Sequence, residues 1–583
     1  MQTPKIGIRP VIDGRRPAGV EEKAWEMARL AKELIESSLR YMDGTPVECV
    51  VSPVLIGGSR EAAICAEAFS TENVCATLSV TPCWCFGSET MDMDPMTIKA
   101  VWGFNATGRP GAVYLAAVMA AHAQMKLPAF SIYGADVQDE TDDFITEDVK
   151  EKILQFAKCA IAVGEMRGKC YVNIGAVSMG IAGSICDPEF FRSYLGIRSE
   201  WVDMTEVLRR IRDEIYDVEE YERALSWIKE NCREGWDMNP EPHTPEQKAK
   251  EWETIAKLTL ICRDIMLGNP NLTEKGYIEE GHGRNAIAAG FQGQRMWSDW
   301  QPNADFTEAI LNTPFDWNGI RPSITFATEN DTLNAVSMLF SNLITRQSSA
   351  FADVRTFWSP DAIERVTGKR PTGYAKDGII HLINSGSAAL DASGVCKNEK
   401  GEAVMKKWWD MTQEDVQACL DATEWCPADL VSFNGGGFSS HFVTDAEMPV
   451  TMLRVNLVAG LGPVLQIAEG YTCVLEKDMH DLLEQRTNPT WPTTWFAPRL
   501  TGEGAFRDVY SVMANWGANH GCFTYGHIGK DLITLASMLR IPVAMHNVPD
   551  KDVYRPHVWA AFGTKNLESA DYRACEVYGP LYR

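Results

Sequence analysis

KIGIRPVID (residues 5–13), EEKAWEMARLAKELIESSLRYM (21–42) and VECVVSPVLIG (47–57) place a β-branched run, a helical pattern and a second β-branched run in succession, and this stretch decides the fold. The alternation continues through REAAICAEAF (60–69), VCATLSVTP (74–82), AVYLAAVMAAHAQM (112–125) and PAFSIYG (128–134). Strands that alternate with helices in this way indicate a parallel sheet with helices on its faces. We therefore predict an α/β fold that begins with a doubly wound parallel sheet.

The chain divides into three regions where this pattern changes. Gly164 and Gly168 in GEMRGK end the first unit, and YVNIGAVSMGIAG (171–183) opens a second unit of the same kind. The later segments are strand-rich, as in GIIHLINSGSAAL (378–390) and MPVTMLRVNLVAGLGPVLQIAEGYTCVL (448–475). We predict two N-terminal doubly wound parallel-sheet domains, at 1–168 and 169–345, followed by a mixed, strand-rich C-terminal domain at 346–583. The highly charged run at 206–232 is expected to be a solvated helix face.

Size and charge narrow the class of protein. At 583 residues the chain exceeds what one hydrophobic core supports. Its net charge of −24, with no basic cluster, repels a phosphate backbone, so we expect no nucleic-acid partner. The stretch GAVYLAAVMAAHAQM (111–125) is too short for a membrane span, and MQTPKIGIRP lacks the apolar core of a signal peptide. We expect a cytoplasmic protein without membrane contact.

Cysteine and glycine patterns exclude several kinds of site. The sixteen cysteines are scattered and form no CxxC pair, so we expect buried, reduced thiols. The close pair Cys83 and Cys85 fits neither a disulfide nor a tetrahedral metal site. The glycine-rich segments VLIGGSRE, SMGIAGS and FNGGGFSS match no dinucleotide or P-loop motif, so no nucleotide cofactor is indicated.

Two carboxylates end strand-like runs in a similar way. In SITFATENDTLNAV (323–336) the apolar run stops at Glu329, and Asn330, Asp331 or Thr332 can cap the following helix, which leaves Glu329 free. Asp353 ends the run SAFAD 24 residues later, about one strand–helix–strand crossover, so both acids are expected at the same end of neighbouring parallel strands. Facing carboxylates suggest a cation between them. The alternative, in which each acid caps a helix or pairs with Arg355, remains open.

A histidine would complete a metal site. His520 in MANWGANHGCFTYGH lies in a loop rich in Gly and Asn and is the first candidate, with His527 the second, whereas His122 and His546 lie in apolar contexts. Glu329, Asp353 and His520 together form a hard, oxygen-rich ligand set, which suits Mn²⁺ or Mg²⁺ better than thiolate-preferring metals.

A family resemblance extends from one end of the chain to the other. It is carried by these segments: KIGIRPVIDGRR, TPCWCFGSETMDMDP, RPGAVYLAA, PAFSIYGADVQD, GFQGQR, ATENDTLN, FADVRT, LINSGSAALD, TWPTTWFAPRLTG, VMANWGANHG, LITLASMLRIPV and YGPLY. Together they resemble the L-fucose isomerase family. The resemblance implies a cytoplasmic, Mn²⁺-dependent aldose–ketose isomerase that assembles as a homohexamer and acts on a small sugar, L-fucose or D-arabinose.

The resemblance also implies roles for particular residues. Glu329 and Asp353 match the family's two metal-binding, proton-accepting carboxylates, and His520 matches its metal-binding histidine. The implied substrate contacts are Trp84, Gln292, Ser385 and Asn519. At Phe438, in GGGFSS, some relatives carry a tyrosine, which would alter a sugar contact.

The implied reaction moves a proton through a cis-enediol. One carboxylate removes the proton at C2 of the open-chain aldose, and its return at C1 gives the ketose. Trp84, Trp491 and Trp495 are expected to cover the apolar face of the sugar. Trp84 lies in the first domain and the metal ligands in the other two, so we predict that Trp84 closes the site of a neighbouring subunit. The alternatives are a metal-dependent aldolase, an L-arabinose-type isomerase and a non-catalytic sugar-binding protein.

Overall fold

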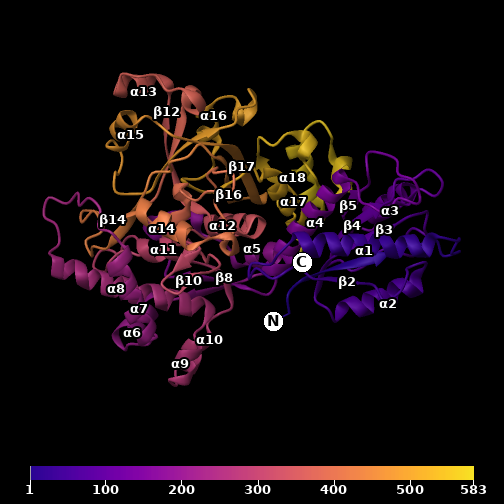
Figure 1. Ribbon diagram of the computed structural model, residues 1–583, viewed down its shortest axis with the longest axis horizontal. Helices are drawn as coiled ribbons and strands as arrows, with labels where there is room; N and C mark the ends of the chain where they lie inside the picture. The colour runs from indigo at the N-terminus through magenta and orange to yellow at the C-terminus, as the bar shows by residue number, and fades with distance from the viewer. Residues whose placement is uncertain (1, 583) are drawn as a thin grey trace.

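The computed structural model describes residues 2–582 and contains three principal sheets that follow one another along the chain (Figure 1). The first is a five-stranded, fully parallel sheet in the order β2-β1-β3-β4-β5. Its strands are β1 (Lys5–Pro10), β2 (Cys49–Val51), β3 (Val74–Thr81), β4 (Ile98–Gly103) and β5 (Ala129–Ile132). Its helices are α1 (Val20–Ser38), α2 (Ser59–Ser70), α3 (Gly111–Gln124) and α4 (Glu147–Met166). This strand order is a doubly wound one, so the prediction for the first unit is confirmed.

The second sheet is also parallel, with four strands in the order β11-β8-β6-β7. Its strands are β6 (Cys170–Ile174), β7 (Arg198–Val202), β8 (Ala286–Phe291) and β11 (Thr325–Ala327). The longer helices of this region are α6 (Met204–Arg212), α7 (Val218–Asn231), α8 (Pro245–Leu267), α11 (Asp305–Asn312) and α12 (Thr332–Thr345). Almost every residue of α12 is buried, because this helix packs against both the second sheet and the third.

The third sheet closes on itself. Six antiparallel strands follow the order β16-β19-β12-β13-β18-β17, and β17 pairs again with β16, so the strands form a barrel. They are β12 (Ala350–Trp358), β13 (Ile379–Ile383), β16 (Pro449–Val458), β17 (Gly462–Cys473), β18 (Thr493–Pro498) and β19 (His520–Tyr525). A short strand, β20 (Val543–Met545), adds to β17 in parallel, and β14 (Glu424–Pro427) pairs with β15 (Phe438–His441) beside the barrel. The predicted mixed, strand-rich C-terminal region is confirmed.

The segment after the barrel returns to the first sheet. In Figure 1 the yellow helices α17 (Gly529–Leu539) and α18 (Leu567–Tyr578) lie beside the indigo and purple elements of the first unit. Gln155 Nε2 donates to Thr534 Oγ1 at 2.9 Å, and Lys158 pairs with Asp531 at 2.6 Å. The largest hydrophobic cluster accordingly contains residues of all three sheets. The three regions therefore pack as one body.

One expected feature of the topology is wrong. Glu329 and Asp353 do not end neighbouring parallel strands: β11 belongs to the second sheet, whereas β12 is a barrel strand that pairs antiparallel with β13 and β19. The chain crosses from one sheet to the other through α12. The sequence has the spacing of a parallel crossover, but β12 pairs antiparallel with the next strand, β13, and with β19, which lies much later in the chain.

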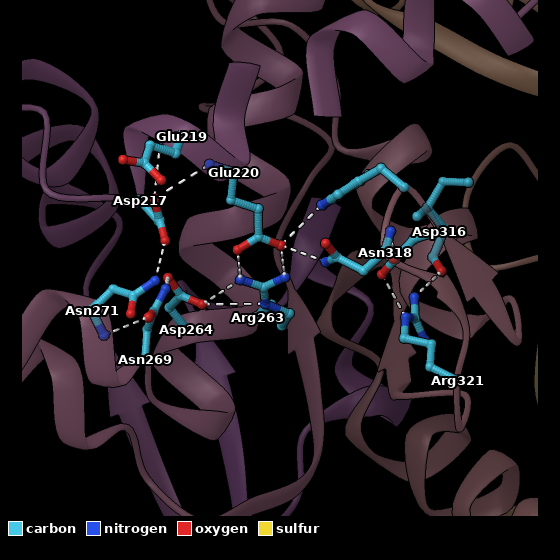
Figure 2. Close-up of polar contacts among 12 residues, drawn as sticks. Asp217, Glu219, Glu220, Arg263, Asp264, Asn269, Asn271, Asp316, Asn318 and Arg321 are labelled. Atoms are coloured by element: carbon cyan, nitrogen blue, oxygen red, sulfur yellow. Dashed lines mark hydrogen bonds and ion pairs between the residues drawn. The ribbon is translucent and has the colours of Figure 1, made fainter. Parts of the chain in front are cut away.

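The charged run at 206–232 is not simply a solvated face. It forms α6 and α7, and both Arg210 and Glu220 are buried. Glu220 accepts hydrogen bonds from Arg263, from Trp317 Nε1 at 2.9 Å and from Asn318 Nδ2 at 2.7 Å (Figure 2). Burial alone would raise the pKa of Glu220, but these contacts lower it to about 2. The run therefore includes a buried polar network.

Two further observations concern the cysteines and the helices. All sixteen cysteines are free, and only Cys232 is not fully buried. Among residues 2–582, no helix combines the length and the apolar character that crossing a membrane requires.

Candidate active site

Glu329 lies in an unusual backbone conformation directly after β11. The short turn Thr328–Asn330 has φ 57° at Glu329 and φ 46° at Asn330, a region that residues with a side chain rarely adopt. Asn330 is held there by Tyr171 Oη, which donates to its side-chain oxygen at 3.1 Å. Strained backbone of this kind persists where surrounding contacts enforce it, and it concentrates at functional sites.

The helix that follows is capped by Asp331. Its Oδ1 accepts from Asn334 N at 3.0 Å at the start of α12. Of the three candidate caps, Asp331 therefore takes the role, and the interpretation that Glu329 is not needed for capping is confirmed.

Asp353 and His520 come from neighbouring barrel strands. Asp353 on β12 is directly opposite His520, the first residue of β19. Asn384 Nδ2 donates to Asp353 Oδ1 at 3.3 Å, and Arg355 Nη1 lies 3.4 Å from Asp353 Oδ2. The contact with Arg355 that the alternative interpretation expected is therefore present, but it uses only one of the two carboxylate oxygens.

The structure brings the three predicted ligands together. His520 Nε2 lies 3.3 Å from Glu329 Oε2 and 3.4 Å from Asp353 Oδ1. The side chains of Glu329 and His520 are almost fully buried, whereas that of Asp353 is 25% exposed. The site is therefore enclosed on the side of the second sheet and open to solvent near Asp353.

The electrostatics of the cluster are set by a second acid. His520 Nδ1 lies 2.7 Å from Asp331 Oδ2, and Arg454 Nη1 lies 2.5 Å from the same oxygen. Burial alone would raise the pKa of Asp331, but Arg454 and His520 hold it well below its usual value. Burial alone would lower the pKa of His520, but Asp331, Asp353 and Glu329 raise it well above its usual value. The cluster of acids around His520 therefore favours positive charge.

A divalent cation fits this donor set. Glu329 Oε2 is buried and makes no hydrogen bond within residues 2–582, although it faces His520 Nε2. His520 Nε2 is near each carboxylate, but Glu329, Asp353 and His520 do not place three ligand atoms within 4.8 Å of one another, so one cation held by all three would require the side chains to move closer. Two carboxylates and one imidazole would supply hard ligands to Mn²⁺ or Mg²⁺.

Three of the predicted substrate residues lie around this cluster. Asn519 Nδ2 is 2.9 Å from His520 Nε2. Gln292 is buried after β8, and its Oε1 accepts from Ala176 N at 2.9 Å, which leaves its amide NH₂ to contact a ligand. Ser385 is buried in the loop after β13, directly after Asn384, whose side-chain amide donates to Asp353.

The aromatic residues differ from one another in position. Trp84 lies in the loop between β3 and β4, is 40% exposed, and has no ring contact or hydrogen bond to Glu329, Asp353 or His520 among the described residues. Trp491 is half-buried beside Arg355, with 5.6 Å between the guanidinium and the ring. Trp495 is buried, stacks on His381 and donates to His480, so its expected role as a sugar cover is wrong. Phe438 is fully buried and stacks on Trp252 at 4.1 Å.

Sequence reasoning missed two further acids, Asp305 and Glu308. Both lie on α11 and are buried, although DFTEAILN reads as an ordinary helix with polar positions. Burial raises the pKa of Asp305 to about 7 and that of Glu308 well above its usual value, and each is raised further by Glu329. Glu308 Oε2 has no hydrogen-bond partner among residues 2–582. No sequence pattern distinguishes these acids from solvent-exposed ones.

The other candidate ligands do not join this site. His527 Nε2 donates to Gly470 O at 2.9 Å, which is a structural contact. A separate group, Glu424, Cys426 and His441, has ligand atoms within 4.8 Å of one another on the β14–β15 pair. Arg233 already pairs with Glu424 at 3.2 Å, and burial raises the pKa of Cys426 to about 12. Among residues 2–582, this is the group whose three ligand atoms lie within 4.8 Å of one another, and its thiol distinguishes it from the oxygen-rich set at His520.

Fold and site together describe an α/β protein with an antiparallel barrel, in which two carboxylates converge on one buried histidine. Three family models match the chain, namely the first N-terminal domain of L-fucose isomerase at residues 3–168, its second N-terminal domain at 169–346 and its C-terminal domain at 382–546.

Full-length relatives give the same result. The chain is 60% identical to the L-fucose isomerase of Clostridium perfringens (strain 13 / Type A) and 60% identical to that of Phocaeicola vulgatus, in each case over all of this chain and 99% of the relative. It is 58% identical to the L-fucose isomerase of Streptococcus pneumoniae serotype 2 over the whole of both chains. The chain belongs to the L-fucose isomerase family.

Proposed function

We propose that this protein converts L-fucose to L-fuculose, and D-arabinose to D-ribulose, with Mn²⁺ as its cofactor. The observation that carries the proposal is the convergence of Glu329 and Asp353 on His520 Nε2, at 3.3 and 3.4 Å, with Asn519 Nδ2 2.9 Å from the same nitrogen. The family relationship supports the choice of sugar.

The residues of this chain would hold the metal and move the proton. Glu329, Asp353 and His520 would be the ligands, and the bound cation would polarise the carbonyl of the open-chain sugar. One of the two carboxylates removes the proton from C2, which gives a cis-enediol, and proton return to C1 gives the ketose. The other carboxylate assists proton movement between the hydroxyls at C1 and C2. General acid–base catalysis of this kind contributes ~10²–10⁴-fold.

The surrounding residues orient the sugar. Ser385 and the amide of Gln292 offer polar contacts from buried positions, which favours a fixed pose over a mobile one. Asn519 is close enough to His520 to contact a sugar oxygen near the cation. Trp491 lies beside Arg355, which contacts the partly exposed Asp353, and we assign it to cover the sugar.

Assembly supplies the remaining aromatic. We propose a cytoplasmic homohexamer in which Trp84 of one subunit covers the site of another. The support is the 40% exposure of this tryptophan within one chain, together with its place in the loop between β3 and β4 of the first sheet, whereas Asp353 and His520 belong to the barrel. An exposed aromatic in a loop is typical of an interface.

Metal removal and replacement test the proposal. Treatment with a chelator should abolish ketose formation from L-fucose, Mn²⁺ should restore it, and Zn²⁺ should restore it poorly. Full activity in protein that contains no bound metal would overturn the metal assignment.

Substrate and isotope experiments separate the alternatives. Ketose formation without carbon–carbon cleavage excludes an aldolase, and comparison of L-fucose, D-arabinose and L-arabinose separates this enzyme from an L-arabinose-type isomerase. In D₂O we expect deuterium at C1 of the ketose, because a carboxylate proton can exchange with solvent before it returns. A sugar-binding protein would bind L-fucose and release it unchanged.

A further inference from the structure

We propose that Asp331 is a positioning residue that holds the His520 proton on Nδ1 and thereby directs the lone pair of Nε2 to the cation. The proposal rests on the proposed function, because it assumes that His520 binds a cation. It also assigns a second role to Asp331, which the sequence marked only as a candidate helix cap. It concerns the affinity of the site for a divalent cation rather than the chemical step.

Hydrogen-bond chemistry fixes the direction of the contact. His520 Nδ1 and Asp331 Oδ2 are 2.7 Å apart, and both side chains are buried. Asp331 pairs with Arg454, so its carboxylate can only accept hydrogen bonds. The proton of this contact must therefore belong to Nδ1. In a neutral imidazole the other nitrogen then carries the lone pair, and that nitrogen is the one near Glu329 and Asp353.

Asp331 is itself held by groups from three parts of the fold. Its Oδ1 caps α12 through Asn334 N, and its Oδ2 faces Arg454 on β16 and His520 on β19. Arg454 is almost fully buried, and its Nη2 donates to Gly183 O at 3.3 Å. A carboxylate restrained on all sides cannot rotate away from the imidazole, so the orientation is built into the packing.

The ring and the backbone of His520 are also restrained. The Phe351 ring packs against the imidazole with 4.7 Å between centroids, and Trp516 Nε1 donates to the His520 carbonyl at 3.1 Å. These contacts fix the place of the ring but do not distinguish its two nitrogens. Within residues 2–582, Asp331 is the only hydrogen-bond partner of Nδ1. Asn519 Nδ2 lies 2.9 Å from Nε2, and an amide NH₂ only donates, so this contact also favours a lone pair on Nε2 but leaves Nδ1 to Asp331.

The effect of losing such a partner has a known size. Residues that accept a hydrogen bond from the second nitrogen of a metal-binding histidine typically raise the metal affinity by 10–100-fold. Asp331→Asn keeps the volume and a good helix cap, but its neutral amide cannot accept from Nδ1, Arg454 and Asn334 together. We expect Mn²⁺ to bind this variant about 10–100-fold more weakly than the wild-type enzyme. Asp331→Ser also caps the helix but is too short to reach the imidazole, and it should show the same loss.

A matched control separates this effect from general damage. Asp217 is another buried aspartate that caps a helix of the second region: it accepts from Glu219 N and Glu220 N at the start of α7 and from Asn271 (Figure 2). Asp217→Asn changes the same chemical group at the same kind of position, away from His520. We expect Mn²⁺ affinity within about twofold of wild type for this variant.

The experiment measures Mn²⁺ binding to full-length protein by the electron paramagnetic resonance of the free ion, beside the ¹⁵N spectrum of histidine-labelled, Mg²⁺-loaded protein. The proposal expects the wild-type His520 proton on Nδ1, assigned with a His520→Gln variant, and weaker binding in both Asp331 variants. If wild-type protein binds Mn²⁺ and Asp331→Asn binds equally well, or if the wild-type proton lies on Nε2, the role of Asp331 is overturned while the proposed function stands. If wild-type protein binds no Mn²⁺, both are overturned.

Discussion

Gly386→Ala should damage the active site through one buried contact. A Cβ at Gly386 would lie 1.9 Å from Glu308 Oε2 and 2.6 Å from Thr328 Oγ1. Gly386 directly follows Ser385, and Thr328 directly precedes Glu329. A displacement of this loop would therefore also move Ser385, a candidate substrate contact, and Glu329, a candidate metal ligand.

The size of the effect follows from the distances. Ordinary contact needs about 3.5 Å, so Glu308 or the loop must move by about 1.5 Å. Glu308 is buried and has no route into solvent. Overpacking of this kind costs about 1–3 kcal/mol of stability. A misplacement of about 1 Å at a catalytic site lowers turnover by about 10²-fold, so we expect a kcat for ketose formation near 1% of wild type.

A compensating change tests the cause. Glu308→Asp withdraws the carboxylate by about one carbon–carbon bond, which is close to the required displacement. The double variant Gly386→Ala/Glu308→Asp should therefore recover at least about tenfold of the lost kcat. Gly58→Ala is the control, because a Cβ there would meet only Glu89, at 3.8 Å. The reasoning is refuted if Gly386→Ala keeps half or more of wild-type kcat, or if Glu308→Asp does not improve it.

Three further predictions concern the same enzyme. Asp353→Asn should bind sugar yet lose at least ~10²-fold in kcat, and near-normal turnover would remove Asp353 from the mechanism. Asp391→Asn should raise the thermal midpoint at about pH 8 and change it little at about pH 4, which differential scanning calorimetry can check. Burial raises the pKa of Asp391 to about 7, so wild-type stability falls by up to about 1.4 kcal/mol per pH unit between about pH 4 and pH 7, whereas an amide has no such dependence and still matches the Ser348 hydroxyl. Mixed oligomers of Asp353→Asn and Trp84→Ala subunits should regain activity after dissociation and reassembly, and no recovery would mean that Trp84 does not act between subunits.

The parallel sheets were predictable because their information is local. The segments of the first region carry the strand and helix periods in order, and short crossovers leave few alternative pairings. The barrel was predictable only as a strand-rich region. The barrel closes because β16 pairs with both β17 and β19. The alternation of apolar and polar residues within one strand does not show which other strand it will pair with.

The candidate site divides in the same way. Glu329 could be singled out because the residues after it already satisfy the helix cap, and Asp353 because it interrupts an apolar run. Glu329 and Asp353 were expected to lie close together, and they do, but for another reason. The prediction assumed a parallel crossover within one sheet, whereas the chain passes from the second sheet to the barrel between these two residues. Asp331 looked interchangeable with Asn330 and Thr332, and only the packing of Arg454 and His520 against it separates them. Buried acids such as Glu308 had no signal because burial is a property of the neighbours.

The site exists only where the second sheet and the barrel meet. Glu329 lies just after the end of β11, whereas Asp353 and His520 lie on the barrel strands β12 and β19. The helix α12 joins these parts: Asn334 Nδ2 donates to Gly521 O at 3.1 Å, and Ser337 Oγ accepts from Val455 N at 2.8 Å. Because the same helix is capped by Asp331, we expect a shift of the barrel relative to the second sheet to change the proposed cation ligands and the orientation of His520 together. Metal affinity should therefore report on the packing of α12, and substitutions that loosen this helix should weaken Mn²⁺ binding even when they leave every ligand in place.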